Sequence, residues 1–313
     1  MIRPTRISTR SNSSTVIRAM PVVKVLCLIA ALLLPGAAGE AAAGASSLTV
    51  TDALGRRVTV PAFPRRIVSV APSVTEILFA LGLDSRIVGV SSADDTPAEQ
   101  VAGRPRVGGV TLDVERIISL RPDLILGVAS LQRGQLERLI ALRLPVVAVE
   151  ARTLPDLYAQ VQQIGQVTGA PDQAARLIGT MRRKEHAVAA ALRGRPRRHV
   201  YVEISAEPMM TAGAGTFVSD LVMRAGGVNV FADVTGWPLV SEEAVLRRNP
   251  EVIVAAYPGG RRLIARRGWD RIRAARAGRV GEVDASLLSR PGPRIVDGLR
   301  SLAAIIHPEA FGR

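Results

Sequence analysis

Histidine, cysteine and the short motifs of known catalysts are the features most able to do chemistry in this sequence of 313 residues. The histidines His186, His199 and His307 lie far apart along the chain, and Cys27 is the single cysteine. Metal centres and cysteine-based catalysis need several such groups within reach of one another. The sequence also contains no Gly-x-Ser-x-Gly elbow, phosphate-binding P-loop or His-Glu-x-x-His motif. We therefore expect a protein that is not an enzyme and has no resident metal or cofactor.

A glycine segment and two arginine-rich runs are weaker candidates for a binding role. Gly213-Ala214-Gly215 stands between an expected strand and an expected helix, where backbone N–H groups can cradle an anion. Without further glycines or a later acidic partner, a plain turn is the favoured interpretation. The basic runs at 195–198 and 261–262 are short, and aromatic residues make up 3% of the chain. Because single strands bind on aromatic platforms, the net charge of +14 does not predict a nucleic-acid partner.

A pair of glutamates occupies equivalent positions in an internal repeat. Residues 113–126 and 241–254 align without a gap, and each segment begins with a helix-capping residue, Asp113 or Ser241. Glu115 and Glu243 then fall at the second helical position. A first-turn acid stabilises a helix by about 0.3–1 kcal/mol, which explains one such glutamate more readily than a matched pair. The repeat predicts two similar lobes, and a cleft between lobes is a common place for a small-molecule site.

Apolar strands alternate with helices on both sides of the repeat. We expect strands at 66–71, 86–90, 124–126, 146–149, 199–202, 252–254 and 279–280. We expect helices at 73–81, 113–120, 136–142, 154–167, 172–193 and 217–224, the first opened by a capping box of Ser73 and Glu76. Strands that are apolar at consecutive positions are typical of parallel sheets covered on both faces. The predicted fold class is α/β, with two Rossmann-like lobes of mostly parallel sheets bridged by one long rigid helix.

The first 45 residues have the order of a secretory signal. A basic segment precedes an apolar run at 25–34, and small residues follow that include Ala43-Gly44-Ala45, a suitable cleavage site. The run is too short to span a bilayer, which needs about 20 residues, although an N-terminal anchor is the alternative. Cys27 lies inside the run behind Leu26, so it is not predicted to carry a lipid. The expected organisation is a cleaved signal at 1–45, lobes at 48–152 and 196–313, and linking helices at 153–195.

Several segments resemble one family of transport proteins. Residues 66–82 are similar to the opening of periplasmic solute-binding proteins for cobalamin, haem and ferric siderophores, and the two repeat segments resemble that family's paired helices. The segments 211–217, 225–231, 236–243 and 289–294 are most similar to the cobalamin-binding members. The resemblance implies a periplasmic monomer that captures cobalamin or a related corrinoid. It also implies delivery of this metal chelate to an inner-membrane ABC permease with a cytoplasmic ATPase.

The resemblance also assigns roles to individual residues. Glu115 and Glu243 match the two glutamates that dock on permease arginines, where Arg-carboxylate pairs can be bidentate, and Glu242 is the neighbour that could be confused with Glu243. Trp237 matches a cleft tryptophan whose indole face suits a flat corrin ring, the alternative being a packed core residue. The predicted ligand-binding set comprises Ser73, Ser92, Ala93, Asp94, Gly109, Trp237, Ser286, Leu287, Leu288, Ser289 and Arg290.

Two departures from the cobalamin pattern keep other ligands open. Ala93 and the segment Gly108-Gly109-Val110 stand where the pattern favours aromatic residues. Arg290 and Arg294 could instead bind the carboxylates of haem or of an anionic siderophore, although no Tyr or His falls where a haem-binding member places an iron ligand. A ferric-siderophore or haem carrier is therefore the alternative, and an exported enzyme on a two-lobe scaffold is a remote one.

Overall fold

Two parallel sheets organise residues 47–312, the part of the chain that the computed structural model describes. In the first sheet the strands run in the order β4-β3-β5-β6, and in the second the equivalent order is β9-β7-β10-β11. The bounds of these strands are Ile67–Ser69 (β3), Ile87–Gly89 (β4), Leu124–Val128 (β5), Val146–Val149 (β6), Arg198–Ala206 (β7), Gly227–Asn229 (β9), Val252–Ala255 (β10) and Val280–Glu282 (β11). The predicted pair of α/β lobes is therefore confirmed, while the predicted signal falls outside the described residues.

The sequence did not predict strand β9, an antiparallel strand beside β7, or a separate hairpin near the start of the described residues. Strand β8 (Met209–Thr211) pairs antiparallel with β7, and β1 (Ser47–Thr51) forms an antiparallel hairpin with β2 (Arg57–Pro61). In the hairpin every second residue is exposed on the outer face. Such alternation is typical of antiparallel strands with one wet face, and it differs from the buried runs of the parallel strands.

The consecutive apolar residues of the central strands pack on two different faces. In β5, Leu124 and Leu126 join a large central cluster, whereas Ile125 points into a second cluster beneath the sheet. In β10, Val252 and Val254 join the same central cluster, whereas Ile253 packs into a third. Each sheet thus buries both faces, which explains why these strands show no polar alternation.

Helices cover both sheets. Their bounds are Pro72–Ala80 (α1), Ala98–Val101 (α2), Val114–Ser119 (α3), Ala129–Ala141 (α4), Leu154–Val167 (α5), Pro171–Ala191 (α6), Phe217–Arg224 (α7), Glu242–Arg248 (α8), Arg273–Arg276 (α9), Ala285–Ser289 (α10) and Ile295–Ile306 (α11). The part described contains no helix long and apolar enough to cross a membrane.

The start of α1 differs from the sequence prediction. Its N-cap is Ala71, which makes no side-chain capping bond, and Pro72 occupies the first helical position. Proline suits that position because its fixed φ is helical and its missing N–H has no partner there. The predicted capping box is therefore wrong, because Ser73 and Glu76 both lie inside the helix and are buried. The carboxylate of Glu76 binds elsewhere, as described below.

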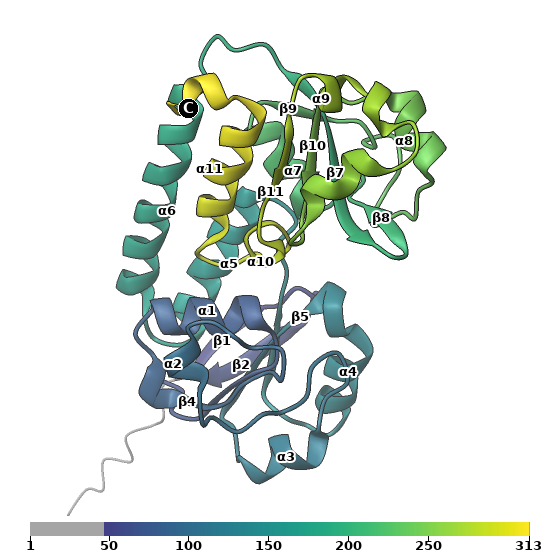
Figure 1. Cartoon of the computed structure of the whole chain (residues 1–313). Helices are drawn as coiled ribbons and strands as arrows, with labels where there is room; N and C mark the ends of the chain where they lie inside the picture. Colours follow the sequence, from purple (N-terminus) through teal and green to yellow (C-terminus); the bar gives the residue numbers. More distant parts are fainter. Residues whose placement is uncertain (1–46, 313) are drawn as a thin grey trace, which may run out of the picture. The chain divides into compact units, whose positions relative to one another are not determined.

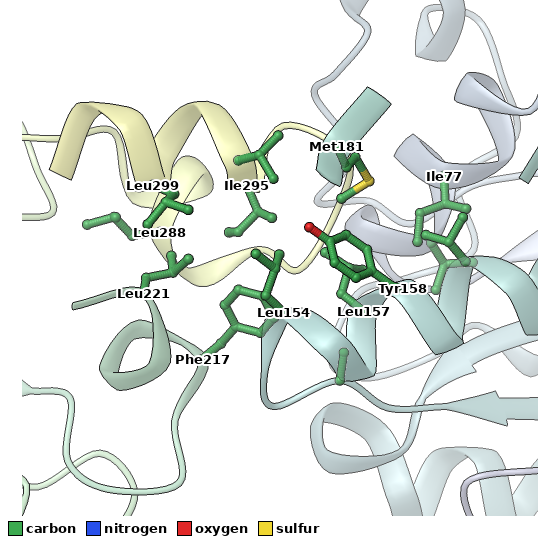
Figure 2. Close-up of a cluster of buried hydrophobic side chains, with 14 of the residues drawn as sticks. Ile77, Leu154, Leu157, Tyr158, Met181, Phe217, Leu221, Leu288, Ile295 and Leu299 are labelled. Carbon is green, nitrogen blue, oxygen red and sulfur yellow. The ribbon is translucent and has the colours of Figure 1, made fainter. Parts of the chain in front are cut away.

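Two helices connect the lobes. Helix α6, close to its expected bounds, lies beside α11 of the second lobe in Figure 1 and buries a single stripe of side chains, Ala174, Met181 and Val188. Helix α5 packs against α6 and contacts both α1 and α7. Figure 2 shows Leu154, Leu157 and Tyr158 of α5 among side chains from both lobes. The central cluster is consequently continuous from one lobe to the other.

Candidate functional site

A cavity of about 1590 Å³ lies between the two lobes. Its wall in the first lobe includes residues that follow β3 and β6, and its wall in the second lobe includes residues that follow β10 and β11. The carboxyl ends of parallel strands are the usual ligand-binding edge of open α/β sheets. The cavity exceeds the roughly 300–1,000 Å³ of common small-molecule sites, so it has room for a bulky solute.

Seven of the eleven predicted ligand-binding residues line this cavity: Ser73, Ala93, Gly109, Trp237, Ser286, Ser289 and Arg290. The other four do not. Leu288 is fully buried in the central cluster, and Leu287 packs partly buried against it. Asp94 is buried beneath the wall, where it accepts hydrogen bonds from Thr75 Oγ1 at 2.8 Å and Ser91 N at 2.9 Å. Ser92 is exposed outside the cavity.

The aromatic residues of the cleft all come from the second lobe. Phe217, Trp237 and Tyr257 line the cavity, whereas none of the described first-lobe residues that line it is aromatic. Trp237 is 46% exposed, so it is not a packed core residue, and the fully buried tryptophan is Trp269. An exposed indole in a concave wall offers a flat apolar surface to a ring-shaped ligand.

The charges of the cavity wall are nearly balanced, although the whole chain has a net charge of +14. The ionisable residues that line the cavity are Asp95, Glu150, Glu282, Asp284, Arg152, Arg290 and Arg294. Glu150 accepts hydrogen bonds from the backbone N–H and the hydroxyl of Ser130, at 2.7 and 2.9 Å. The arginine excess of the chain therefore lies elsewhere on the protein.

Two of the cleft arginines are held by carboxylates of the other lobe. Arg290 Nη1 lies 2.6 Å from Asp95 Oδ1 and 3.1 Å from Glu76 Oε1. Arg294 donates from Nη2 and Nε to the two oxygens of Glu76, at 2.8 and 3.1 Å. Burial disfavours the charge on Arg290, but the hydrogen bonds to Asp95 and Glu76 outweigh it and raise its pKa. The hydrogen bond from Arg290 in turn lowers the pKa of Asp95.

Gln132 is a cleft residue that sequence reasoning missed. Its Nε2 donates to the carbonyls of Val70 and Gly109, at 2.9 and 2.5 Å, and so ties the end of β3 to the cavity loop. Gln132 sits at a break in α4, with φ −139° and ψ 25°, where the helical pattern of the sequence is interrupted. A glutamine in a polar stretch carries no signal that would have identified this contact.

The helices that present the two repeat glutamates have matched geometry. Asp113 accepts a hydrogen bond from Arg116 N at 2.8 Å, and Ser241 accepts one from Ala244 N at 3.3 Å, as the predicted N-caps. Glu115 and Glu243 are both exposed at the second helical position. A hydrogen bond from the Ser241 side chain lowers the pKa of Glu243.

Glu242 is distinguished from Glu243 by its surroundings. Glu242 is partly buried, and its Oε1 lies 4.0 Å from Arg266 Nε. Arg266 also donates to the buried carboxylate of Glu203 through two nitrogens, at 2.7 and 2.8 Å. Glu242 therefore lies beside an ion-pair network of its own lobe, whereas the neighbouring Glu243 is exposed on the outer surface.

The repeat extends further toward the N-terminus than the sequence alignment suggested. Gly108 and Gly236 stand at equivalent positions, and both have positive φ, 89° and 73°. A side chain on Gly108 would also meet the Thr111 carbonyl. The next residues, Gly109 and Trp237, both line the cavity. In each lobe, one short segment thus runs from the cavity wall to the exposed glutamate of α3 or α8.

Two of the histidines and the glycine segment that the sequence singled out make contacts within the protein. His307 is fully buried with Nε2 3.2 Å from the Gly226 carbonyl, and His199 Nδ1 lies 3.2 Å from Glu251. Within residues 47–312, His, Cys, Asp and Glu side chains form no group of three suited to a metal ion. Gly213 donates its N–H to the Gly236 carbonyl at 2.8 Å, which makes the glycine segment part of a packed turn.

Comparison with known proteins agrees with this architecture. A family model described as periplasmic binding protein matches residues 67–287. An ABC transporter substrate-binding lipoprotein of Bacillus subtilis, YvrC, is 33% identical over 273 residues, which cover 84% of this chain and 87% of that protein. The chain belongs to the periplasmic binding protein family. Proteins of this family are the substrate-binding components of ABC transporters and are not enzymes.

Relatives of this periplasmic binding protein have more than one described ligand. A vitamin B12-binding protein of Pectobacterium carotovorum is 32% identical over 246 residues, covering 75% of this chain and 86% of that protein. A solved structure from Staphylococcus epidermidis, described as a possible iron-binding periplasmic solute-binding protein, is 33% identical with a TM-score of 0.70. It covers 78% of this chain and 99% of that one.

Proposed function

We propose that this periplasmic binding protein captures cobalamin or a related corrinoid and carries it, as an exported monomer, to an inner-membrane ABC permease. The observation that carries the proposal is the cavity of about 1590 Å³ with the half-exposed indole of Trp237 in its wall. A corrinoid is a wide ring with many uncharged amide groups. It would place apolar surface on the indole and polar groups against the serines of the opposite wall.

The charge of the cavity supports a solute without strong negative charge. Arg290 and Arg294 are already bonded to Asp95 and Glu76, so their guanidinium groups are not free for ligand carboxylates. Glu150 adds a further acid to the wall. An uncharged or cationic corrinoid suits this surface better than a dicarboxylate, because like charges in a partly desolvated site repel. The similarity to a vitamin B12-binding protein agrees with this choice.

Calorimetric titration of the exported protein with cyanocobalamin tests the proposal. We expect binding at micromolar concentrations or tighter, and we expect Trp237→Ala to weaken it about tenfold or more, because the large ring contact is lost. Met223→Ala, which removes an exposed apolar side chain from α7 away from the cavity, is the matched control and should leave affinity unchanged. No heat with cyanocobalamin would refute the corrinoid assignment.

An iron chelate is the second candidate cargo. It is favoured by the similarity to the Staphylococcus epidermidis protein and by the presence of three arginines in the cavity wall. Visible absorption separates the two candidates, because corrinoids, haem and ferric siderophores each have their own spectrum. A protein that retains a haem or siderophore band after purification, and that gives no heat with cyanocobalamin, would establish the iron chelate.

The delivery step of the proposal rests on Glu115 and Glu243. We propose that these exposed carboxylates, one on each lobe, pair with arginines of the permease, whose cytoplasmic ATPase drives import. Arg-carboxylate pairs would orient the protein as well as bind it, because their bidentate geometry is directional. Residues 1–45, the proposed export signal, would deliver the chain to the periplasm.

A further inference from the structure

We infer that Glu76 makes the cleft select solutes without a strong negative charge. Its carboxylate is ion-paired with two cleft arginines that would otherwise bind an anionic chelate. The inference rests on the proposed role in solute capture and narrows its substrate class to ligands without a strong negative charge. Glu76 is not itself in the cavity wall. It lies on α1 of the first lobe, and its side chain is 5% exposed.

The geometry gives Glu76 control of both arginines. Its Oε1 accepts from Arg290 Nη1 at 3.1 Å and from Arg294 Nη2 at 2.8 Å, and its Oε2 accepts from Arg294 Nε at 3.1 Å. Arg290 and Arg294 belong to the segment between α10 and α11 of the second lobe, and both line the cavity. One buried carboxylate of one lobe therefore bonds two cationic groups of the other.

The segment that carries the arginines is packed closely on the carboxylate. A side chain added at Gly292, between the two arginines, would lie 3.0 Å from Glu76 Oε2. The side chains of Arg290 and Arg294 are 18% and 35% exposed, so each keeps a face toward the cavity while its donors point to Glu76. The cluster is consequently a fixed part of the wall rather than a chance surface pair.

The second acid of the cluster differs from Glu76 in burial. Asp95 bonds Arg290 at 2.6 and 3.3 Å, but its side chain is 63% exposed. Exposed ion pairs are weak and screened by salt, whereas a buried carboxylate that loses its charge leaves its partners uncompensated. Together the two acids neutralise the two arginines. Without the Glu76 carboxylate, the Ser286 hydroxyl at 3.3 Å would be the remaining hydrogen-bond acceptor of the Arg294 side chain among the described residues.

The test compares neutral and anionic ligands on matched variants of the exported protein. The probes are cyanocobalamin and haemin with both axial positions filled by cyanide, so that the haemin presents its ring and carboxylates but no open iron site. We expect Glu76→Gln to bind dicyanohaemin at least about tenfold more tightly than the unaltered protein, the gain typical of a new charge-assisted hydrogen bond. In the double variant Glu76→Gln/Arg294→Gln this gain should disappear.

Glu150→Gln is the matched control. It removes one negative charge from the same cavity but frees no arginine, because Glu150 bonds Ser130. Its gain in dicyanohaemin affinity should stay below about threefold, as expected for a screened charge change. Equal gains for Glu76→Gln and Glu150→Gln would overturn the inference. So would an unaltered protein that binds dicyanohaemin as tightly as Glu76→Gln does.

Two further measurements keep the result interpretable. Asp95→Asn alters an exposed side chain and should fold normally, and a gain in dicyanohaemin affinity of about threefold is expected from partial release of Arg290. No gain would count against the inference even if Glu76→Gln were unstable. Failure of the unaltered protein to bind cyanocobalamin refutes the proposed corrinoid function. That failure does not affect the test of Glu76, which depends on the ratio of dicyanohaemin affinities between the variants and the unaltered protein.

Discussion

Glu76, Asp94 and Glu203 are buried carboxylates, and each accepts a hydrogen bond from a residue in another element of the chain. Glu76 bonds arginines more than 200 residues away, and Glu203 bonds Arg266 and Tyr201. The sequence placed Glu76 in a capping box because a Ser-x-x-Glu spacing is a local signal. The ion pairs that Glu76 forms instead depend on how the two lobes pack together, which no local sequence pattern predicts. Side-chain pairing of this kind is the part of the site that sequence reasoning could not supply.

Asp94 leads to a prediction about stability and pH. Burial raises the pKa of its carboxyl from the ordinary 3.8 to about 6, outweighing the hydrogen bonds from Thr75 and Ser91 and the attraction of Arg106. One of its oxygens, Oδ1, has no hydrogen-bond partner among the described residues. The folded protein then holds this proton more tightly than the unfolded chain does. The contribution of Asp94 to stability is therefore greatest below about pH 4 and falls as the pH rises to about 6.

Asp94→Asn should remove this dependence. We expect the variant to be more stable than the unaltered protein at pH 7 by about 1–3 kcal/mol, with the difference shrinking toward pH 4. Urea unfolding at several pH values between 4 and 7 measures both effects. A stability difference between the two proteins that does not change between pH 4 and pH 7 would contradict the raised pKa of Asp94.

At the scale of elements, the repeat segments were the most predictable part of the fold. Helices α3 and α8 begin and end close to the expected positions, because their N-caps and following prolines recur in both copies. The acids after those prolines also have matching roles. Asp123 accepts from Arg65 N and Arg66 N, and Glu251 accepts from His199 N, so each acid holds the start of the lobe's central strand.

Other elements could not be predicted because their local pattern is irregular or absent. Helix α4 begins seven residues earlier than expected, since the break at Gln132 interrupts its apolar pattern. Helix α5 has the bounds that the sequence predicted, and Thr153 and Asp156 form a capping box at its start. The short strands β8 and β9 are defined by their pairing with β7 rather than by their own composition.

The paired helices lead to a prediction about transport. Glu115→Arg and Glu243→Arg should each impair uptake of the bound solute in cells, because each places a cation where the proposed permease arginines would meet a carboxylate. Ligand affinity of the purified variants should stay within about twofold, since neither glutamate lines the cavity. Uptake of labelled cyanocobalamin, together with titration of the same proteins, separates the two effects.

Glu137→Arg is the matched control for this experiment. Glu137 is also exposed, on α4 of the first lobe, and forms only a 3.6 Å surface pair with Arg133. The substitution changes the net charge by the same amount without touching α3 or α8. Normal uptake by the double variant Glu115→Arg/Glu243→Arg, or equal impairment by Glu137→Arg, would contradict a docking role for the repeat glutamates.

At the scale of the whole described unit, the lobes are coupled by a shared core. The described residues belong to one compact unit, and the central cluster takes side chains from α1, α5, α7 and α11 (Figure 2). The lengths and apolar faces of α5 and α6 were visible in the sequence. The contact of α5 with α1 of the first lobe and α7 of the second was not, because it depends on which faces meet. A core that passes through the connection opposes a wide hinge motion, since opening would expose buried apolar surface.

We therefore expect the distance between the lobes to change little when a solute binds. Residues 46–313 contain no cysteine, so Ala141→Cys in the first lobe and Ala232→Cys in the second allow two exposed spin labels to be attached. Pulsed electron paramagnetic resonance should give distributions of the distance between the two spin labels whose means differ by less than about 2 Å with and without cyanocobalamin. A shift of more than about 5 Å would show that the lobes close on the solute as a hinge.

Leu157→Ala tests whether the shared core causes this rigidity. Leu157 is fully buried in α5 within the central cluster, and its truncation should cost about 2–5 kcal/mol of stability and broaden the distance distribution. Leu139→Ala is the matched control, because Leu139 is equally buried in the separate cluster beneath the first sheet. It should cost a similar stability while leaving the distribution narrow. Equal broadening by both variants would mean that general loosening, rather than packing between the lobes, controls their separation.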